Sequence, residues 1–262
     1  MDTSLNSRYA LVCGSTQGIG LAAARELAAL GATCILLARN KAKLEAAIAG
    51  LPTPEGQQHY YEVADFTDLG AVNGAANRIM ARFPVTVLVN NTGGPPAGAI
   101  TDAPVQSFEQ AFRQHLGCNQ CLVSAALPAM KAAGYGRIIN VISTSVKTPL
   151  PELGVSNTVR AAVAAWAKTL ANEVGAFGIT VNNVLPGPTY TGRLESLMKH
   201  TAEKTGKPLD EVERSMVSTI PLRRFGQAEE IAHVVAFLAS PAAAYITGAS
   251  IPVDGGKTPS LS

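Results

Sequence analysis

Short apolar, β-branched runs alternate with longer segments of helical periodicity along most of the chain, and this alternation constrains the fold more than any other feature. Seven runs suit buried strands: YALVCG, TCILLA, HYYEVA, VTVLVN, GRIINVIS, ITVNNVL and GASIPVD. Six helical segments fall between them, near residues 18–30, 40–49, 67–82, 104–133, 155–175 and 227–239. Strands and helices that alternate in this way form a parallel sheet covered by helices on both faces. The sequence therefore predicts an α/β fold built on one open, doubly wound sheet of seven strands.

A single domain over residues 1–262 is predicted, because no internal repeat and no linker rich in Gly, Ser or Pro divides the chain. Residues 188–225 interrupt the alternation with a polar, mostly helical insertion that follows the strand ITVNNVL. Ligands bind beyond the carboxyl ends of the strands in such sheets. We therefore expect this insertion to form a lid over a substrate site.

Charge and hydropathy point to a small-molecule partner. The formal net charge is +2 and the Lys and Arg residues are dispersed, whereas nucleic acid or an acidic membrane surface requires a clustered basic patch. The N-terminal MDTSLNSRYALVCG lacks the basic and apolar regions of a signal peptide, and no apolar stretch approaches the roughly 18 residues of a membrane span. We expect a cytoplasmic protein that binds neither nucleic acid nor membrane.

The four cysteines include one CxxC pair, Cys118 and Cys121 in CNQC. That spacing is compatible with thiol redox chemistry or with half of a metal site. The pair lies in a helical segment without a second pair of ligands, so we expect buried core cysteines and no metal, with the redox role as a minor alternative.

A glycine pattern, CGSTQGIG, follows the first predicted strand and leads directly into an alanine-rich helix. Glycines here let the backbone approach a pyrophosphate, and the helix N-terminus supplies free N–H groups and partial positive charge. The pattern predicts a Rossmann-like dinucleotide site. The second strand ends with Ala38 and Arg39, where an acidic residue would bind the ribose hydroxyls and a basic one a 2′-phosphate. NADP(H) is therefore favoured over NAD(H), unless Arg39 is only a surface residue at a strand end.

Further motifs follow in order: VADFTD, LVNNTGG, GRIINVIS, ITVNNVLPGPTYT and YITGASIPVDGG. Together with the glycine pattern they resemble a classical short-chain dehydrogenase/reductase over essentially the whole chain. The resemblance implies hydride transfer between NADP(H) and a carbonyl or alcohol substrate, for example the reduction of a 3-oxoacyl thioester. It also implies a homodimer or homotetramer formed through the helices at 104–133 and 155–175 and the C-terminal strand.

The resemblance assigns cofactor contacts by position. They are Gly14, Thr16, Gln17, Gly18 and Ile19 at the phosphates, Arg39 at the 2′-phosphate, Asp65 and Phe66 at the adenine, Asn90, Asn91 and Gly93 at the adenosine side, and Pro186, Gly187, Thr189 and Thr191 at the nicotinamide end.

The catalytic positions depart from the family, whose members use Asn, Ser, Tyr and Lys. By position these fall on His115, Ser143, Ser156 and Arg160. No tyrosine lies between residues 143 and 160, and none of the six tyrosines is followed by lysine at the fourth residue. We therefore expect the Tyr and Lys of the family to be replaced by Ser156 and Arg160.

This replacement removes the usual proton source, because a serine hydroxyl is a very weak acid and arginine stays protonated. Arg160 can still bind the nicotinamide ribose or a substrate carboxylate, and Ser143 can still polarise a carbonyl. His115, Tyr190 and Lys147 are alternative proton donors. Two of them also have a purely structural interpretation, His115 as a helix residue bonded to a backbone carbonyl and Lys147 as a solvated loop lysine.

Two hypotheses of different kinds remain. The first is a divergent NADP(H)-dependent reductase with a non-standard proton donor, and the second is an NADP(H)-binding sensor, regulator or scaffold without activity. The retained Ser143 and the completeness of the cofactor motifs and of the substrate lid favour the enzyme. The insertion mixes apolar and basic residues, which is compatible with an acyl chain, a sugar or a small ketone.

Overall fold

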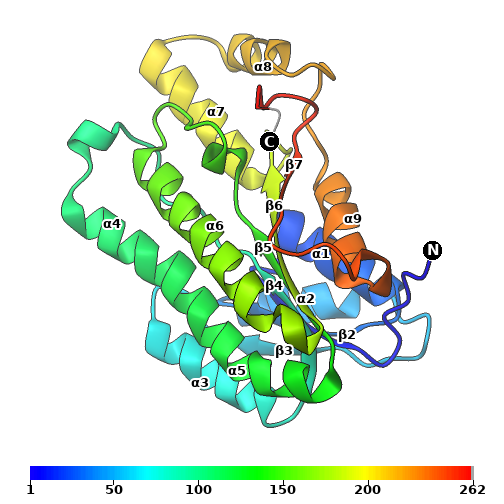
Figure 1. Ribbon diagram of the computed structural model, residues 1–262. Coiled ribbons are helices and arrows are strands. Elements are labelled where there is room, and N and C mark those ends of the chain that lie inside the picture. Colours follow the sequence, from blue (N-terminus) through cyan, green and yellow to red (C-terminus); the bar gives the residue numbers. More distant parts are fainter. Residues whose placement is uncertain (261–262) are drawn as a thin grey trace.

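The structure is a computed structural model that describes residues 1–260. Within these residues one parallel sheet of seven strands runs in the order β3-β2-β1-β4-β5-β6-β7 (Figure 1). The strands are β1 Tyr9–Cys13, β2 Thr33–Ala38, β3 Tyr60–Val63, β4 Val85–Asn90, β5 Gly136–Val141, β6 Ile179–Pro186 and β7 Ser250–Val253. The predicted fold class is confirmed. The strand order reverses between β1 and β4, and ligands bind at such a reversal in open α/β sheets.

Helices cover both faces of the sheet (Figure 1). They are α1 Gly18–Ala29, α2 Lys41–Ala49, α3 Leu69–Met80, α4 Val105–Phe112, α5 Cys118–Ala133, α6 Gly154–Val174, α7 Gly192–Thr205, α8 Leu209–Ser218 and α9 Ala228–Ala239. The helices α1, α2 and α9 pack on one face, and α3, α5 and α6 pack on the other. Side-chain caps begin two of them, because Asn40 accepts from the Lys43 amide and Asp68 from the Ala71 amide.

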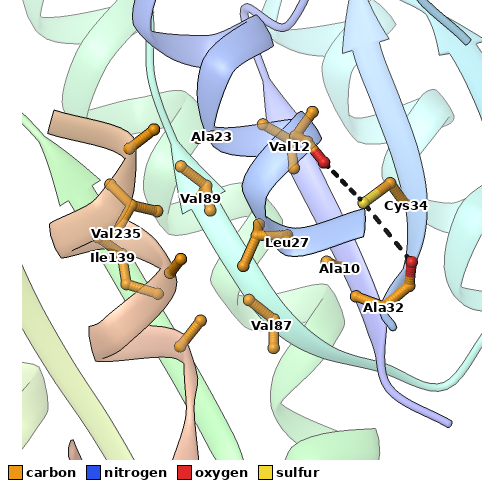
Figure 2. Close-up of a cluster of buried hydrophobic side chains, with 14 of the residues drawn as sticks. Ala10, Val12, Ala23, Leu27, Ala32, Cys34, Val87, Val89, Ile139 and Val235 are labelled. Atoms are coloured by element: carbon orange, nitrogen blue, oxygen red, sulfur yellow. Dashed lines mark hydrogen bonds between the residues drawn. The ribbon is translucent and has the colours of Figure 1, made fainter. Parts of the chain in front are cut away.

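Successive side chains along each strand pack into opposite layers of the core, because side chains in a strand alternate between its two faces. On β1, Val12 faces the layer of α1 and α9, while Leu11 faces the layer of α3, α5 and α6. Figure 2 shows the first layer, in which Leu27 of α1 and Val235 of α9 lie over the strands. The Cys34 thiol in this layer donates to the carbonyls of Ala24 and Ala32, and burial raises its pKa to about 12.

The helix predicted over residues 104–133 is interrupted. Between α4 and α5 lies a π-helical turn, Arg113–Gly117, which holds one more residue than an α-helical turn and carries His115. The two cysteines of the CxxC pair follow on α5, where Cys118 is buried and Cys121 half-buried. Both are free thiols, and burial raises the pKa of each.

The segment between β6 and α9 contains α7 and α8, which lie together at the top of Figure 1. These helices share a small core of their own, formed by Leu194, Met198, Val212, Ile220 and Phe225. The two ends of the segment are joined, because the amide of Tyr190 donates to the Gly226 carbonyl and the amide of Gly226 to the Pro188 carbonyl. No helix in residues 1–260 is both long and apolar enough to cross a bilayer.

Candidate active site

Four loops meet at the carboxyl edge of the sheet, after β1, β4, β5 and β6. The loops after β4 and β5 run side by side, since Gly98 pairs with Leu153 and its amide donates to the Glu152 carbonyl at 2.8 Å. The loop after β6 contacts the glycine turn, because a Cβ added at Gly18 would lie 3.3 Å from the Thr191 methyl group. Residues distant in sequence therefore share one site.

The glycine turn after β1 requires glycine on geometric grounds. Gly14 has φ 58°, and a Cβ added to it would lie 2.5 Å from the Asn91 carbonyl oxygen. A Cβ on Gly20 would lie 2.2 Å from the Gly14 carbonyl oxygen. The Asn91 amide donates to the carbonyls of Cys13 and Gly14 and so joins this turn to the loop after β4.

The N-terminus of α1 suits a phosphate group. Its N-cap residue, Gln17, makes no side-chain capping hydrogen bond, and the first turn holds no acidic residue. The positive end of the helix dipole is therefore not neutralised by the residues around it. Of the other residues assigned to the phosphates, Thr16 and Ile19 are half-buried in the same turn.

Arg39 and Asp65 lie together beyond the ends of β2 and β3. Their charged groups are 3.8 Å apart, and the Arg39 side chain is 76% exposed. Hydrogen bonding from Thr67 lowers the pKa of Asp65, and Arg39 contributes to the same shift. The Arg39 guanidinium is exposed at this edge, and its contact with a 2′-phosphate stays a prediction. Phe66 follows directly and packs against the core under α3 and α5.

The residues assigned to the nicotinamide end form a tight turn after β6. Thr189 donates to the Gly187 carbonyl, and Thr191 donates to the Thr189 carbonyl. A Cβ on Gly187 would lie 2.5 Å from the Asp254 Cβ, so this turn packs directly on the chain after β7. Pro186 ends β6 at the start of the turn.

Asn90 is placed differently from the other predicted cofactor residues. Its side chain is buried within the sheet and donates to Asn140, which donates to Asn183, which donates to Ser250. The amide therefore belongs to a row of polar side chains across β4 to β7. Gly93, by contrast, is exposed in the loop after β4.

The structure brings Ser156 and Arg160 together beside the end of β5, which Ser143 follows. Ser143 follows β5 and accepts from the Ser145 amide at 3.0 Å, which begins a short 3₁₀ turn. Ser156 and Arg160 lie one turn apart on α6 and are buried, at 6% and 9% exposure. The Arg160 Nε donates to the Ser156 Oγ at 3.2 Å.

Arg160 is folded back against the end of β5. Its Nη1 donates to the Ile142 carbonyl at 2.7 Å and to the Val141 carbonyl at 3.4 Å. Burial lowers its pKa to about 10, and the charge of Arg193 adds to this effect. The guanidinium nevertheless remains protonated at neutral pH, so Arg160 supplies charge and N–H donors to the site but no exchangeable acid.

His115 is buried beside this group. Its Nδ1 lies 2.7 Å from the Thr92 hydroxyl, and its Nε2 is buried without a partner in the described part of the chain. The partner of Nδ1 is thus a side chain and not the backbone carbonyl of the structural interpretation. Burial lowers the pKa of His115 to about 3, helped by the charge of Arg160. The ring is therefore neutral at physiological pH, which argues against an imidazolium as the proton donor.

The other two candidate donors lie on loops. Tyr190 is 51% exposed in the turn after β6. Lys147 is half-buried at the end of the 3₁₀ turn, four residues after Ser143, and its ammonium group makes no hydrogen bond or ion pair with residues 1–260. Of the candidate donors, Lys147 is thus the closest along the chain to Ser143.

Sequence reasoning did not single out Arg193, which the structure places at the site. Its Nη2 donates to the Pro95 carbonyl at 2.7 Å, so the first turn of α7 is linked to the loop after β4. Gly94 lies between two guanidinium groups: a Cβ added there would be 3.3 Å from Arg160 Nη2 and 3.5 Å from Arg193 Nη2. The sequence held one signal for Arg193. A cation in the first turn of a helix interacts unfavourably with the helix dipole, so an arginine there suggests a role other than stabilising the helix.

The sheet, the glycine turn at its first crossover and the residues at its carboxyl edge define the class of the protein. The chain belongs to the short-chain dehydrogenase/reductase family of NAD(P)-dependent oxidoreductases. Residues 14–258 match a family model described as enoyl-(acyl carrier protein) reductase.

Individual relatives match over nearly their full length. The chain is 34% identical to the 3-oxoacyl-(acyl-carrier-protein) reductase FabG of Haemophilus influenzae, over 96% of this chain and 98% of that protein. It is 30% identical to the dehydrogenase/reductase SDR family member 4 of Bos taurus, over 97% and 88%. The crystal structure of L-sorbose reductase from Gluconobacter frateurii, complexed with NADPH and L-sorbose, superposes with a TM-score of 0.93 at 30% identity and covers 100% of both chains.

Proposed function

We propose that the protein is an NADP(H)-dependent reductase of a carbonyl substrate, with Ser156 and Arg160 in place of the usual tyrosine and lysine. One observation carries the proposal. Arg160 is buried and held by Ser156 and by the carbonyls at the end of β5, directly before Ser143. This arrangement keeps a desolvated positive charge next to the residue expected to polarise the substrate, which supports an active site.

Preference for NADP(H) over NAD(H) is supported by Arg39 and by the relatives. The exposed guanidinium at the end of β2 suits a 2′-phosphate, and the uncapped α1 suits the pyrophosphate. The similar L-sorbose reductase contains NADPH. When bound, the cofactor supplies or accepts the hydride, while the residues of this chain hold and polarise the substrate.

In the proposed mechanism Ser143 donates its hydroxyl proton in a hydrogen bond to the substrate carbonyl, while its own oxygen is fixed by the Ser145 amide. Arg160 stabilises the negative charge that develops on that oxygen, and its effect is strengthened because the group is largely removed from water. Lys147 or a water molecule then delivers the proton. His115 keeps its place beside Thr92 as a neutral ring.

The nature of the relatives supports a carbonyl substrate without fixing its size. FabG is named for a 3-oxoacyl-(acyl-carrier-protein), whereas the similar solved reductase binds L-sorbose. Reduction of a 3-oxoacyl thioester is therefore one form of the proposal. The lid role of residues 188–225 is a further part of it, supported by the separate core of α7 and α8.

The test measures NADPH binding by fluorescence and NADPH oxidation by absorbance, against a mixed panel of ketones, aldehydes, sugars and 3-oxoacyl thioesters. We expect turnover that falls by roughly 10²- to 10³-fold in Ser143→Ala, the range seen on removing one donor to a developing oxyanion. Ser145→Ala is the matched control, because the Ser145 hydroxyl makes no hydrogen bond within residues 1–260. Tight NADPH binding without oxidation across the panel would favour the non-catalytic binding protein instead.

A further inference from the structure

Two arginines approach each other at the site from different elements. Arg160 comes from α6 and Arg193 from the first turn of α7, and a Cβ added at Gly94 would lie within 3.5 Å of the Nη2 atom of each. The hydrogen bond from Arg193 to the Pro95 carbonyl holds this approach in place. The fold therefore brings a buried cation, Arg160, close to an exposed one, Arg193, which its bond to Pro95 holds in place.

No carboxylate compensates the two charges. Within residues 1–260 neither guanidinium forms an ion pair, although Arg39, Arg78, Arg214 and Arg224 each do so elsewhere. Burial lowers the pKa of both groups, and the charge of Arg193 lowers the pKa of Arg160 further. Two partly desolvated like charges without an anion are unfavourable in free energy, so an anion that binds between them would remove this cost.

The donors that remain free suit such an anion. Arg160 uses Nε and Nη1 for Ser156 and the end of β5, and Arg193 uses Nη2 for Pro95. No bond within residues 1–260 occupies Arg160 Nη2 or Arg193 Nε and Nη1. Planar guanidinium groups bind carboxylates and phosphates through paired N–H donors. Gly94 has no side chain, and any Cβ there would crowd both Nη2 atoms.

We propose that Arg160 and Arg193 form a binding site for an anionic group of the substrate, a carboxylate or a phosphate, beside the carbonyl that Ser143 polarises. This inference rests on the proposed function for its link to catalysis, but binding of the anion itself is measurable without turnover. It narrows the substrate class to carbonyl compounds that carry a negative charge near the reacting carbon.

The experiment is calorimetric titration of the protein saturated with NADP⁺, in a buffer free of phosphate and carboxylate, with acetate and separately with inorganic phosphate. We expect at least one of the two anions to bind, and its affinity to fall about 10-fold or more in Arg193→Gln, as the loss of a charge-assisted hydrogen bond implies. Arg193→Lys should recover part of the affinity. The relative affinities of acetate and phosphate distinguish the two kinds of anionic group.

Arg214→Gln is the control, because Arg214 lies on α8 and pairs with Asp210 at 2.7 Å. Its anion affinity should equal that of the unmodified protein. Gly94→Ala retains both arginines and should also weaken the binding of the anion. Binding of neither anion, or equal binding to Arg193→Gln, would overturn the proposal.

Two further measurements separate the alternatives. If Arg193→Gln weakens the binding of NADPH and not the binding of the added anion, then Arg193 binds the cofactor and the proposal is wrong. If NADPH oxidation is absent while anion binding depends on Arg193, the anion site stands and the proposed reductase fails. With any active substrate, a carboxylic acid should lose at least about 10-fold more kcat/KM in Arg193→Gln than its methyl ester does.

Discussion

Arg160 stabilises the end of β5 as well as supplying charge to the site. Its guanidinium satisfies the Ile142 and Val141 carbonyls and the Ser156 hydroxyl, all in a buried place. Replacement with methionine keeps the length of the side chain but leaves these acceptors without a donor. We expect Arg160→Met to lower the free energy of unfolding by about 1–3 kcal/mol, measured by urea denaturation. Arg214→Met, at an exposed ion pair, should change it by less than about 1 kcal/mol.

His115 makes the stability depend on pH in a direction that follows from its depressed pKa. Burial and then the charge of Arg160 lower this pKa from 6.5 to about 3 in the folded protein. Between these values the unfolded chain binds a proton that the folded protein does not, so acid favours unfolding. The contribution of His115 is therefore a loss of stability as pH falls below 6.5, with a slope of at most about 1.4 kcal/mol per pH unit.

His115→Asn tests this, since asparagine fits the same position without titrating. Urea denaturation at several pH values between 5 and 7.5 should show a weaker dependence on pH in the variant than in the unmodified protein. The interpretation of His115 as a buried neutral ring would be wrong if both proteins lost stability equally on acidification.

At the scale of elements, the row of polar side chains joins β4, β5, β6 and β7 through Asn90, Asn140, Asn183 and Ser250. Asn140 is fully buried at the centre of this row, accepting from Asn90 and donating to Asn183. Asn140→Leu leaves one donor and one acceptor unpaired, at about 1–3 kcal/mol each. We expect a large fall in the urea midpoint, and little change in Asn77→Leu on the exposed side of α3. Equal effects of the two variants would show that the row contributes nothing.

The elements differ in how far the sequence predicts them. All seven strands follow from their short apolar runs, and the inner strands β1, β4, β5 and β6 need no alternation to be found because both of their faces are buried. The break between α4 and α5 does not follow, since a π turn adds a single residue and the apolar pattern of residues 104–133 continues through it. The conformation of Arg160 is equally invisible in the sequence, because it depends on carbonyls that β5 leaves unpaired at its end.

At the scale of the whole molecule, the sheet and its two helix layers form large cores, whereas α7 and α8 share only a small separate one. Elements with few buried apolar contacts open at lower free energy than the main core. We expect residues 192–218 to exchange amide hydrogens faster than β1, β4 and β5 in a mass-spectrometric exchange experiment. Val212→Ala, in that small core, should increase this local exchange and leave the exchange of the strands unchanged.

The site as a whole was predictable only where a residue's position along the chain fixes its position in space. Ser143, Ser156 and Arg160 follow directly from β5 and α6, and Arg160 bonds both to Ser156 and to the carbonyl of Ile142, the residue before Ser143. The position of Arg193 at the site depends on the direction of α7, and no periodicity in the polar insertion predicts that direction.

The joined ends of this insertion have a consequence for how such a protein changes over evolutionary time. Because Tyr190 and Gly226 are hydrogen-bonded to each other, the chain leaves and re-enters the main body at one point. A change in the length or sequence of the segment between these two residues therefore need not shift β6 or α9. With the lid role proposed for this segment, we expect an exchange of residues 192–225 between relatives to change the choice of substrate and to leave Thr189 and Thr191 of the recipient in place.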